Sequence, residues 1–187
     1  MSWTAVVPLK TRGERKSRLA ELLSAEERAA LSIRMFRHVV DVLADIPAIG
    51  RIVVLADQRP SGWDSDWIAD SGRGLNAELD LVRKAVTGDL IVLHADLPLL
   101  ASEDVIALIA AAARRGLAIA PDRHGTGTNS IAIKGGEEID FAFGADSYRL
   151  HRKQRPDAEV VKRGGFELDL DTKDDLKIAE SLGVEVC

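Results

Sequence analysis

The sequence predicts an α/β fold, a three-layer α/β/α sandwich in which a mostly parallel mixed sheet lies between two layers of helices. Short, nearly continuous apolar segments, such as RIVVLAD at 51–57 and DLIVLHA at 89–95, are typical of strands that are covered on both faces. They alternate with longer segments of helical character, which is the order expected for a sheet between helices. With 187 residues and no repeat, low-complexity tract or linker, the chain is expected to form one domain over 1–187.

The individual elements follow from apolar periodicity and from residues that begin or end helices. Ser24 followed by Glu27 is a capping box that predicts a helix start. Ser102 and Thr172 are the expected N-caps of two later helices, and Gly183 is the expected final stop. The expected strands lie at 4–9, 51–57, 89–95, 117–121, 130–134 and 158–163. The expected helices lie at 25–45, 74–86, 102–115, 146–154 and 172–182.

Composition narrows the class of protein. The content is 46% hydrophobic and 29% charged, and the net charge of −5 argues against general nucleic-acid binding. Cys187 is the only cysteine, which excludes an intrachain disulfide and favours a reducing, cytoplasmic setting. The beginning of the chain does not resemble a signal peptide, and the most apolar run, at 105–113, is too short to span a bilayer. We therefore expect a cytoplasmic protein without a membrane segment.

The charges are unevenly distributed along the chain. The segment KTRGERKSR at 10–18 holds five cationic side chains against one glutamate: Lys10, Arg12, Arg15, Lys16 and Arg18 against Glu14. Acidic side chains gather instead at 167–175. The basic loop follows the first strand, while Asp57 and Asp96 end the second and third, so these groups should meet beyond the carboxyl ends of the strands, where such folds bind ligands. A compact anion and a cation are the ligands that these charges suit.

Six short motifs occur in the order and approximate spacing of a known family. They are VPLK…KSRL, RGLNAEL, ADLPLL, GTGTNS, FGADSYRLH and DLDT, between Val7 and about Leu176. In this respect the chain resembles the 2-phospho-L-lactate guanylyltransferase (CofC) family, which includes the phosphoenolpyruvate and 3-phosphoglycerate guanylyltransferases of deazaflavin coenzyme biosynthesis. It departs from the family in having Lys173 where proline is common, and in being shorter than many members.

The resemblance implies a glycosyltransferase-A-like nucleotidyltransferase fold. It also implies a reaction that joins GTP to a small phosphorylated carboxylic acid and releases pyrophosphate, in the biosynthesis of coenzyme F-420. Such a reaction brings two polyanions together, so lysine, arginine and Mg²⁺ are the parts that it requires. A phosphate nucleophile is already anionic near neutral pH, because its second pKa is about 6. No general base is needed, and the sequence presents no convincing Ser-His-Asp set.

Carboxylates near the ends of strands are the candidate Mg²⁺ ligands, because Mg²⁺ prefers oxygen and usually takes one or two carboxylates from protein. Asp96 precedes Leu-Pro, which turns the chain away, and alternation in LDLD places Asp169 and Asp171 on one face of an extended segment. The alternatives are a turn residue for Asp96 and a solvated strand end for the pair. Which of Asp169 and Asp171 binds metal is left open.

The nucleotide is expected to bind the basic loop and the glycine-rich turn. Glycines allow backbone amides to approach a ligand, and the amide of Asn76 can both donate to and accept from a base edge. The expected nucleotide-binding residues are Pro8, Leu9, Lys10, Lys16, Arg18, Gly72, Gly74, Asn76 and Asp96. Asp96, Lys16 and Arg18 are also the expected catalytic residues. The alternatives are a solvated basic loop and a plain helix start at Gly74.

The acceptor pocket is expected at GTGTNS and FGADS, where small residues, hydroxyls and exposed amides suit a phosphate and a carboxylate. The expected acceptor-binding residues are Thr128, Asn129, Gly144, Ser147 and His151. Ser147 is alternatively a helix cap, and His151 is alternatively structural. The acid itself stays open among 2-phospho-L-lactate, phosphoenolpyruvate and 3-phospho-D-glycerate, because discrimination on that scale depends on pocket shape.

Two other functions are compatible with the same sequence. One is a related transferase that uses CTP or a nucleotide sugar, and the other is a non-catalytic nucleotide-binding module of the same fold. The expected partners are GTP and a small phosphorylated carboxylic acid, with no nucleic acid and no membrane. The oligomeric state is open, and a homodimer is one alternative.

Overall fold

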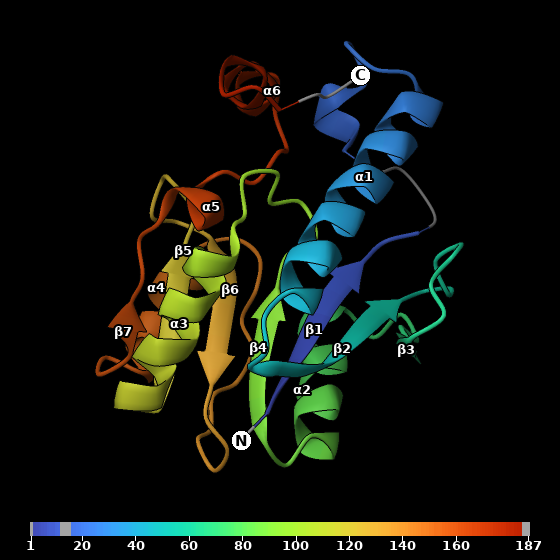
Figure 1. Ribbon diagram of the computed structural model, residues 1–187. Helices are drawn as coiled ribbons and strands as arrows, with labels where there is room; N and C mark the ends of the chain where they lie inside the picture. Colours follow the sequence, from blue (N-terminus) through green and yellow to red (C-terminus); the bar gives the residue numbers. More distant parts are fainter. Residues whose placement is uncertain (1, 12–15, 185–187) are drawn as a thin grey trace.

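The computed structural model describes residues 2–11 and 16–184 (Figure 1). Arg12 and Arg15 of the basic loop, and Cys187, lie outside the described residues. Within them, the strands are β1 (Trp3–Leu9), β2 (Ile49–Ala56), β3 (Asp66–Ala69), β4 (Asp89–Leu93), β5 (Leu117–Pro121), β6 (Thr128–Ile133) and β7 (Glu159–Val160). The helices are α1 (Ala25–Ala44), α2 (Leu75–Ala85), α3 (Ser102–Arg115), α4 (Ser147–Gln154), α5 (Gly164–Glu167), α6 (Lys173–Ser181) and a 3₁₀ turn, η1 (Ser17–Leu19).

The described strands form one mixed sheet in the order β3-β2-β1-β4-β6-β5-β7. β1 pairs in parallel with β2 and β4, and β2 pairs in parallel with β3, as expected for the first half of the chain. β6 runs antiparallel to both β4 and β5, with Leu93 opposite Ser130. The start of β6 therefore lies beside the carboxyl end of β4, and the main-chain N–H of His94 donates to the Asn129 carbonyl over 3.0 Å.

Helices cover both faces of the sheet, which explains the nearly continuous apolar strands. In β1, Ala5 and Val7 pack with Val39 and Leu43 of α1, whereas Val6 belongs to a separate core on the opposite face. That second core includes Leu79 and Val82 of α2 and both Phe141 and Phe143. Figure 1 shows α1 and α3 over one face, with α2 behind the other. The predicted three-layer sandwich is confirmed.

A third core joins distant parts of the chain. Leu19 of η1 and Met35 of α1 pack with Leu168, Leu170 and Leu176 near the end of the chain. All of these side chains are buried. This core holds the turn after the basic loop against the acidic segment, so it brings the two oppositely charged regions of the sequence together.

The predicted capping box at α1 is confirmed, since Ser24 Oγ accepts from the N–H of Glu27 and Glu27 Oε2 accepts from the N–H of Ser24. The prediction of Ser102 as an N-cap is wrong by one residue. Ala101 takes that place, and Asp104 Oδ2 accepts its N–H over 3.0 Å. Alanine has no side-chain acceptor, so the sequence signal fell on the serine beside it.

Three short elements were not predicted, namely β3, α5 and η1. β3 is a half-exposed edge strand with the sequence DWIA, which lacks a run of buried apolar residues. β7 covers two of the six residues expected at 158–163. Among the described residues, no helix is both long enough and apolar enough to cross a bilayer.

Candidate active site

A cavity of about 1060 Å³ opens at the carboxyl edge of the sheet. Its lining brings together almost every residue that the sequence singled out: Pro8, Leu9, Lys10, Lys16, Arg18, Gly72, Gly74, Asp96, Thr128, Asn129, Gly144, Ser147, Asp169 and Asp171. Asn76 and His151 do not line it. Segments from across the whole sequence thus meet in one hollow, because the cavity lies where β1 to β5 end and β6 begins.

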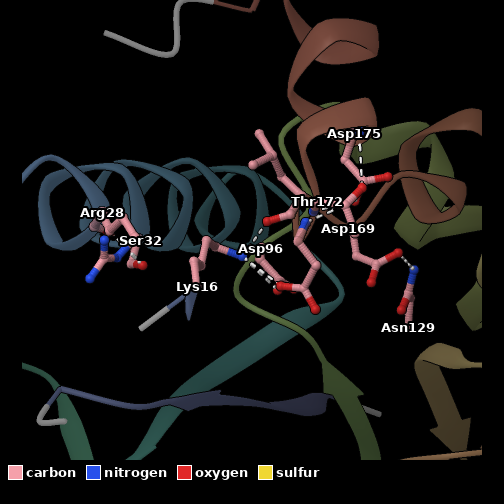
Figure 2. A network of polar contacts seen from close by, with 10 residues as sticks. Lys16, Arg28, Ser32, Asp96, Asn129, Asp169, Thr172 and Asp175 are labelled. Carbon is pink, nitrogen blue, oxygen red and sulfur yellow. Dashed lines mark hydrogen bonds and ion pairs between the residues drawn. The ribbon is translucent and has the colours of Figure 1, made fainter. Parts of the chain in front are cut away.

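Lys16 lies at the centre of a polar network in this cavity (Figure 2). Its Nζ is 3.1 Å from Asp96 Oδ2 and 3.1 Å from Asp171 Oδ1, and it also donates to the Leu170 carbonyl. An ammonium group has three N–H donors, so all three are used by protein oxygens. Contact between Lys16 and a triphosphate, which the sequence predicts, therefore requires at least one of these bonds to open.

Two residues of the basic loop have well-defined local geometry. Asp57 Oδ1 accepts from the main-chain N–H of Thr11 over 2.8 Å and from its hydroxyl over 2.6 Å. Lys16 has a left-handed backbone with φ 47° and ψ 48°, an uncommon conformation for a residue with a side chain. Asp57 thus ends β2 beside the loop as predicted, and Lys10 and Arg18 are exposed at the cavity.

The two neighbouring aspartates have opposite pKa shifts. Burial acts to raise the pKa of Asp96, but the Lys16 charge and hydrogen bond outweigh it, so that pKa is lowered. Burial raises the pKa of Asp169, and the negative charge of Asp96 raises it further, against a 3.3 Å hydrogen bond that its Oδ1 accepts from Asn129 Nδ2. Excess negative charge therefore remains beside the single ammonium.

The carboxylates have features that fit a divalent cation. Asp96 Oδ1 is buried and has no hydrogen-bond partner among the described residues. Asp96 and Asp171 both pair with one cation, Lys16. Asp169 lies close enough for the charges of both aspartates to raise its pKa. Across residues 2–11 and 16–184, no group of three or more Asp, Glu, His or Cys side chains is placed to hold a metal ion, so the three predicted aspartates do not form such a group together. That is compatible with Mg²⁺, which retains waters and phosphate oxygens.

Alternation delivers Asp169 and Asp171 to the cavity as the sequence predicts. Leu168 and Leu170 point into the third core, at 4% and 0% exposure, while both aspartates line the cavity. The N–H of Leu170 donates to the Asp96 carbonyl over 3.1 Å, which fixes this segment beside the end of β4.

The Gly72–Gly74 turn lies at the cavity, but Asn76 does not. Its Nδ2 donates to the Phe143 carbonyl over 3.0 Å, and its Oδ1 accepts from the Phe143 N–H over 2.7 Å. Both hydrogen-bonding ends of the amide are used by one backbone residue, so they are not presented to a base edge. The structure thus favours a clasp between α2 and the 141–144 segment.

His151 is structural rather than exposed to a ligand, which corrects its predicted place in the acceptor pocket. Its ring is fully buried, Nε2 accepts from the N–H of Ala142 over 3.0 Å, and Nδ1 lies 3.0 Å from Thr128 Oγ1. Burial lowers the pKa of His151 to about 4. The sequence around His151 does not indicate that both ring nitrogens form hydrogen bonds within the protein.

Ser147 is the first residue of α4, and its Oγ accepts from the N–H of Thr128 over 2.8 Å. The N-cap position belongs to Asp146, whose side chain makes no capping bond. Ser147 therefore connects α4 to the start of β6. It is not the N-cap of α4, so the helix-cap alternative is wrong.

Several cavity residues were missed by sequence reasoning. Asp122 accepts from the N–H groups of Thr126 and Gly127 over 2.9 and 2.8 Å, which shapes the loop before β6. The sequence PDRHGTG carries the signal for this loop, since aspartate often bonds to nearby backbone in turns. Ser32 and Met35 of α1 also line the cavity, but their helical spacing is that of core residues.

Comparisons with known proteins identify the family to which the chain is similar. Residues 3–180 match the family described as guanylyl transferase CofC like. The phosphoenolpyruvate guanylyltransferase of Sphaerobacter thermophilus is 32% identical, over 95% of this chain and 92% of the relative. The protein of the same name from Streptomyces coelicolor is 33% identical, over 98% and 92%.

Similar solved structures extend to more distant proteins. A putative nucleotide-diphospho-sugar transferase from Desulfovibrio desulfuricans G20 has a TM-score of 0.75 at 19% identity, covering 95% of this chain and 86% of that one. The CMP:2-keto-3-deoxy-manno-octonic acid synthetase complexed with CTP has a TM-score of 0.60 at 13% identity, covering 97% and 98%. These likenesses concern the fold, whereas the family match spans nearly the whole chain. The chain therefore belongs to the family of CofC-like guanylyltransferases and is a nucleotidyltransferase.

Proposed function

We propose that this enzyme transfers the guanylyl group of GTP to the phosphate of a small phosphorylated carboxylic acid and releases pyrophosphate. Phosphoenolpyruvate is the first candidate acid, because similar proteins carry that name. 2-Phospho-L-lactate and 3-phospho-D-glycerate are the others, and the proposed pathway is cytoplasmic biosynthesis of coenzyme F-420. The observation that carries the proposal is the meeting of Lys16 with Asp96 and Asp171 in a cavity that the basic loop also lines.

The proposed reaction is a displacement at phosphorus. A phosphate oxygen of the acid forms a bond to the α-phosphorus of GTP, and the bond from that phosphorus to the oxygen bridging to the β-phosphate breaks. The nucleophile is already an anion near neutral pH, so no side chain must remove a proton. Lys10 and Arg18, exposed at the cavity, are placed to offset the charge of the triphosphate.

Mg²⁺ is the proposed cofactor, and it would supply positive charge that offsets the negative charge of the phosphates. Asp96 and Asp171 would hold it, with Asp169 beside them. The unpartnered Asp96 Oδ1 and the excess of carboxylate charge over Lys16 support this choice. The protein contributes the orientation of these carboxylates and the basic groups that bind the phosphates.

The direction of hydrogen bonds supports an anionic acceptor near Thr128. The Ala142 N–H can only donate, so His151 Nε2 accepts, and the neutral ring carries its proton on Nδ1. Nδ1–H then donates to Thr128 Oγ1. The hydroxyl of Thr128 keeps its own hydrogen to donate, and the same holds for Ser147, whose oxygen already accepts from Thr128. Two hydroxyl donors suit a phosphate or carboxylate.

Pyrophosphate release with every pairing of GTP, CTP or ATP with the three acids tests the proposal. We expect turnover with GTP and one preferred acid, loss of turnover in EDTA, and recovery with Mg²⁺. Activity with CTP alone would reject the guanylyl donor, and no turnover with any pair would favour the binding-module alternative.

Asp96→Ala is the matching variant. GTP binding and a cooperative unfolding transition should persist, with the melting temperature lowered by only a few degrees, while turnover falls by several powers of ten, because a carboxylate that would hold the cation is lost. Retained turnover in this variant would remove Asp96 from the catalytic residues.

A further inference from the structure

Asp175 lies outside the proposed reaction, yet its carboxylate accepts two main-chain N–H groups next to the cavity. Its Oδ2 accepts from the N–H of Asp171 over 3.1 Å, from the N–H of Thr172 over 2.6 Å and from the Thr172 hydroxyl over 2.7 Å. The bond from the Thr172 N–H is one half of the capping box of α6, and the Asp175 N–H, which donates to Thr172 Oγ1 over 3.3 Å, is the other half. The bond to Asp171 lies beyond that box, and it reaches the residue whose side chain contacts Lys16.

The other oxygen of Asp175 faces an arginine from a distant loop. Arg123 Nη2 lies 2.6 Å from Asp175 Oδ1, and the side chains are 25% and 8% exposed. Arg123 Nη1 is buried without a hydrogen-bond partner among the described residues. Asp175 is thus the one carboxylate with a described ion pair to this guanidinium, and each charge compensates for the burial of the other.

Arg123 belongs to the loop between β5 and β6, which also shapes the cavity. Its main-chain N–H donates to the Glu167 carbonyl over 2.9 Å, two residues before Asp169. The preceding residue, Asp122, organises Thr126 and Gly127 on the cavity wall. The loop is therefore fastened to the acidic segment both by its backbone and by the Arg123–Asp175 pair.

We propose that Arg123 and Asp175 are positioning residues, which orient Asp169 and Asp171 for the divalent cation. The inference rests on the proposed function, because it assigns these residues to the same metal site. The N–H of Asp171 is fixed by Asp175, and Asp175 keeps its geometry because Arg123 neutralises it. Groups that orient metal ligands in this way commonly change metal affinity about tenfold to a hundredfold when removed.

The test compares Arg123→Met with Arg123→Lys and with a matched control, Arg114→Met. Arg114 Nη2 also lies 2.6 Å from a carboxylate, that of Glu159, but this pair joins α3 to the edge strand β7, with side chains 59% and 33% exposed. Free Mn²⁺ is titrated into each EDTA-treated full-length protein and followed by electron paramagnetic resonance. Thermal unfolding, and the Mg²⁺ dependence of turnover, are recorded in parallel.

We expect Arg123→Met to weaken Mn²⁺ binding about tenfold or more, with the GTP KM at saturating Mg²⁺ within about twofold of the wild type. Arg123→Lys should recover part of the affinity because it keeps the charge. Arg114→Met should leave Mn²⁺ binding unchanged. If Arg123 has a purely structural role, Arg123→Met should lower the melting temperature, and Mn²⁺ affinity and the GTP KM should then change together or not at all.

Unchanged Mn²⁺ affinity in Arg123→Met would overturn the inference while leaving the proposed function intact. Should that variant fail to fold, Asp175→Asn decides, since it keeps an acceptor for the Thr172 N–H but loses the charge that Arg123 pairs with. Wild-type protein that binds no Mn²⁺ up to millimolar concentrations would instead refute the proposed metal site, and with it this inference.

Discussion

The Lys16 ammonium nitrogen lies 3.1 Å from Asp96 Oδ2, and the two side chains come from loops that are far apart in the sequence. The same nitrogen contacts Asp171 and the Leu170 carbonyl, so one ammonium group offsets only part of the charge of the two carboxylates that we assign to Mg²⁺. The contacts raise the pKa of Lys16 despite its burial, and the group stays charged near neutral pH. A divalent cation therefore competes with an ammonium group for these oxygens.

Replacing Lys16 tests this competition. Lys16→Met should bind Mn²⁺ about tenfold more tightly than the wild type in the absence of nucleotide, because a positive charge beside the metal is removed. Turnover should nevertheless fall, since the phosphates lose a cationic partner. Lys16→Arg, which keeps the charge, should bind Mn²⁺ as weakly as the wild type. Weaker Mn²⁺ binding in the methionine variant would mean that Lys16 supports the metal site and does not compete with it.

The opposite pKa shifts of Asp96 and Asp169 predict opposite effects on stability. Because the pKa of Asp96 is lowered, its charge stabilises the fold at pH values above 3.8, the ordinary pKa of an aspartate. This contribution is lost as the pH falls through the folded-state pKa. The raised pKa of Asp169 means that its charge destabilises the fold at neutral pH, and protonation relieves this as the pH falls toward 3.8.

Asp96→Asn should therefore lower the free energy of unfolding near neutral pH, and Asp169→Asn should raise it, each by on the order of 1 kcal/mol. Both differences should shrink in acid, because the wild-type carboxyls become neutral there. Urea unfolding near neutral pH and again in acid measures this. The same sign for both variants at neutral pH would contradict the electrostatic interpretation.

His151 should give the wild type a stability that rises with pH. Its pKa falls from 6.5 to about 4 on burial, so between these values the unfolded chain binds a proton that the folded protein refuses. Unfolding free energy should increase by about 3 kcal/mol across that window. His151→Gln should remove most of this slope, whereas His124→Gln, at an exposed position, should keep it. A slope that survives in His151→Gln would place its origin elsewhere.

Asn76 distinguishes a structural clasp from recognition of a base. Asn76→Ala removes two hydrogen bonds to the main chain of Phe143, so the N–H and carbonyl of Phe143 lose these partners. We therefore expect the free energy of unfolding to fall by about 2 kcal/mol. Selectivity for GTP over ATP, measured as the ratio of kcat/KM values, should change by less than about twofold. A collapse of that ratio with little loss of stability would restore Asn76 to the nucleotide site.

Most of the fold could be predicted because its strands are buried on both faces and its helices carry amphipathic stripes. β4 is buried along its whole length, and the start of α1 has a complete capping box. β3 could not be predicted in the same way, because a four-residue edge strand is stabilised by pairing with β2 and not by its own pattern. The N-cap at Ala101 depends on Asp104 reaching back, which propensity alone does not reveal.

The cavity was largely predictable because its residues follow the ends of strands or belong to recognisable motifs. The sequence did not reveal which group each of these side chains contacts. Lys16 was expected to face phosphate, but it contacts carboxylates, and His151 and Asn76 were expected to face ligands, but they bond to backbone. Such pairings depend on segments up to 155 residues apart, as between Lys16 and Asp171, and local patterns do not encode them.

The reversal of β6 means that two kinds of strand end line the cavity. β1, β2 and β4 present their last residues to the cavity, whereas β6 presents its first residues, together with the short loop that precedes it. A graft of that loop from a relative with a different acid preference, with Arg123 kept so that its pair with Asp175 is preserved, would exchange only a hairpin and leave the parallel strands intact. Acid preference should then be transplantable without disturbing the nucleotide, which makes this hairpin a natural point for redesign and for divergence among related enzymes.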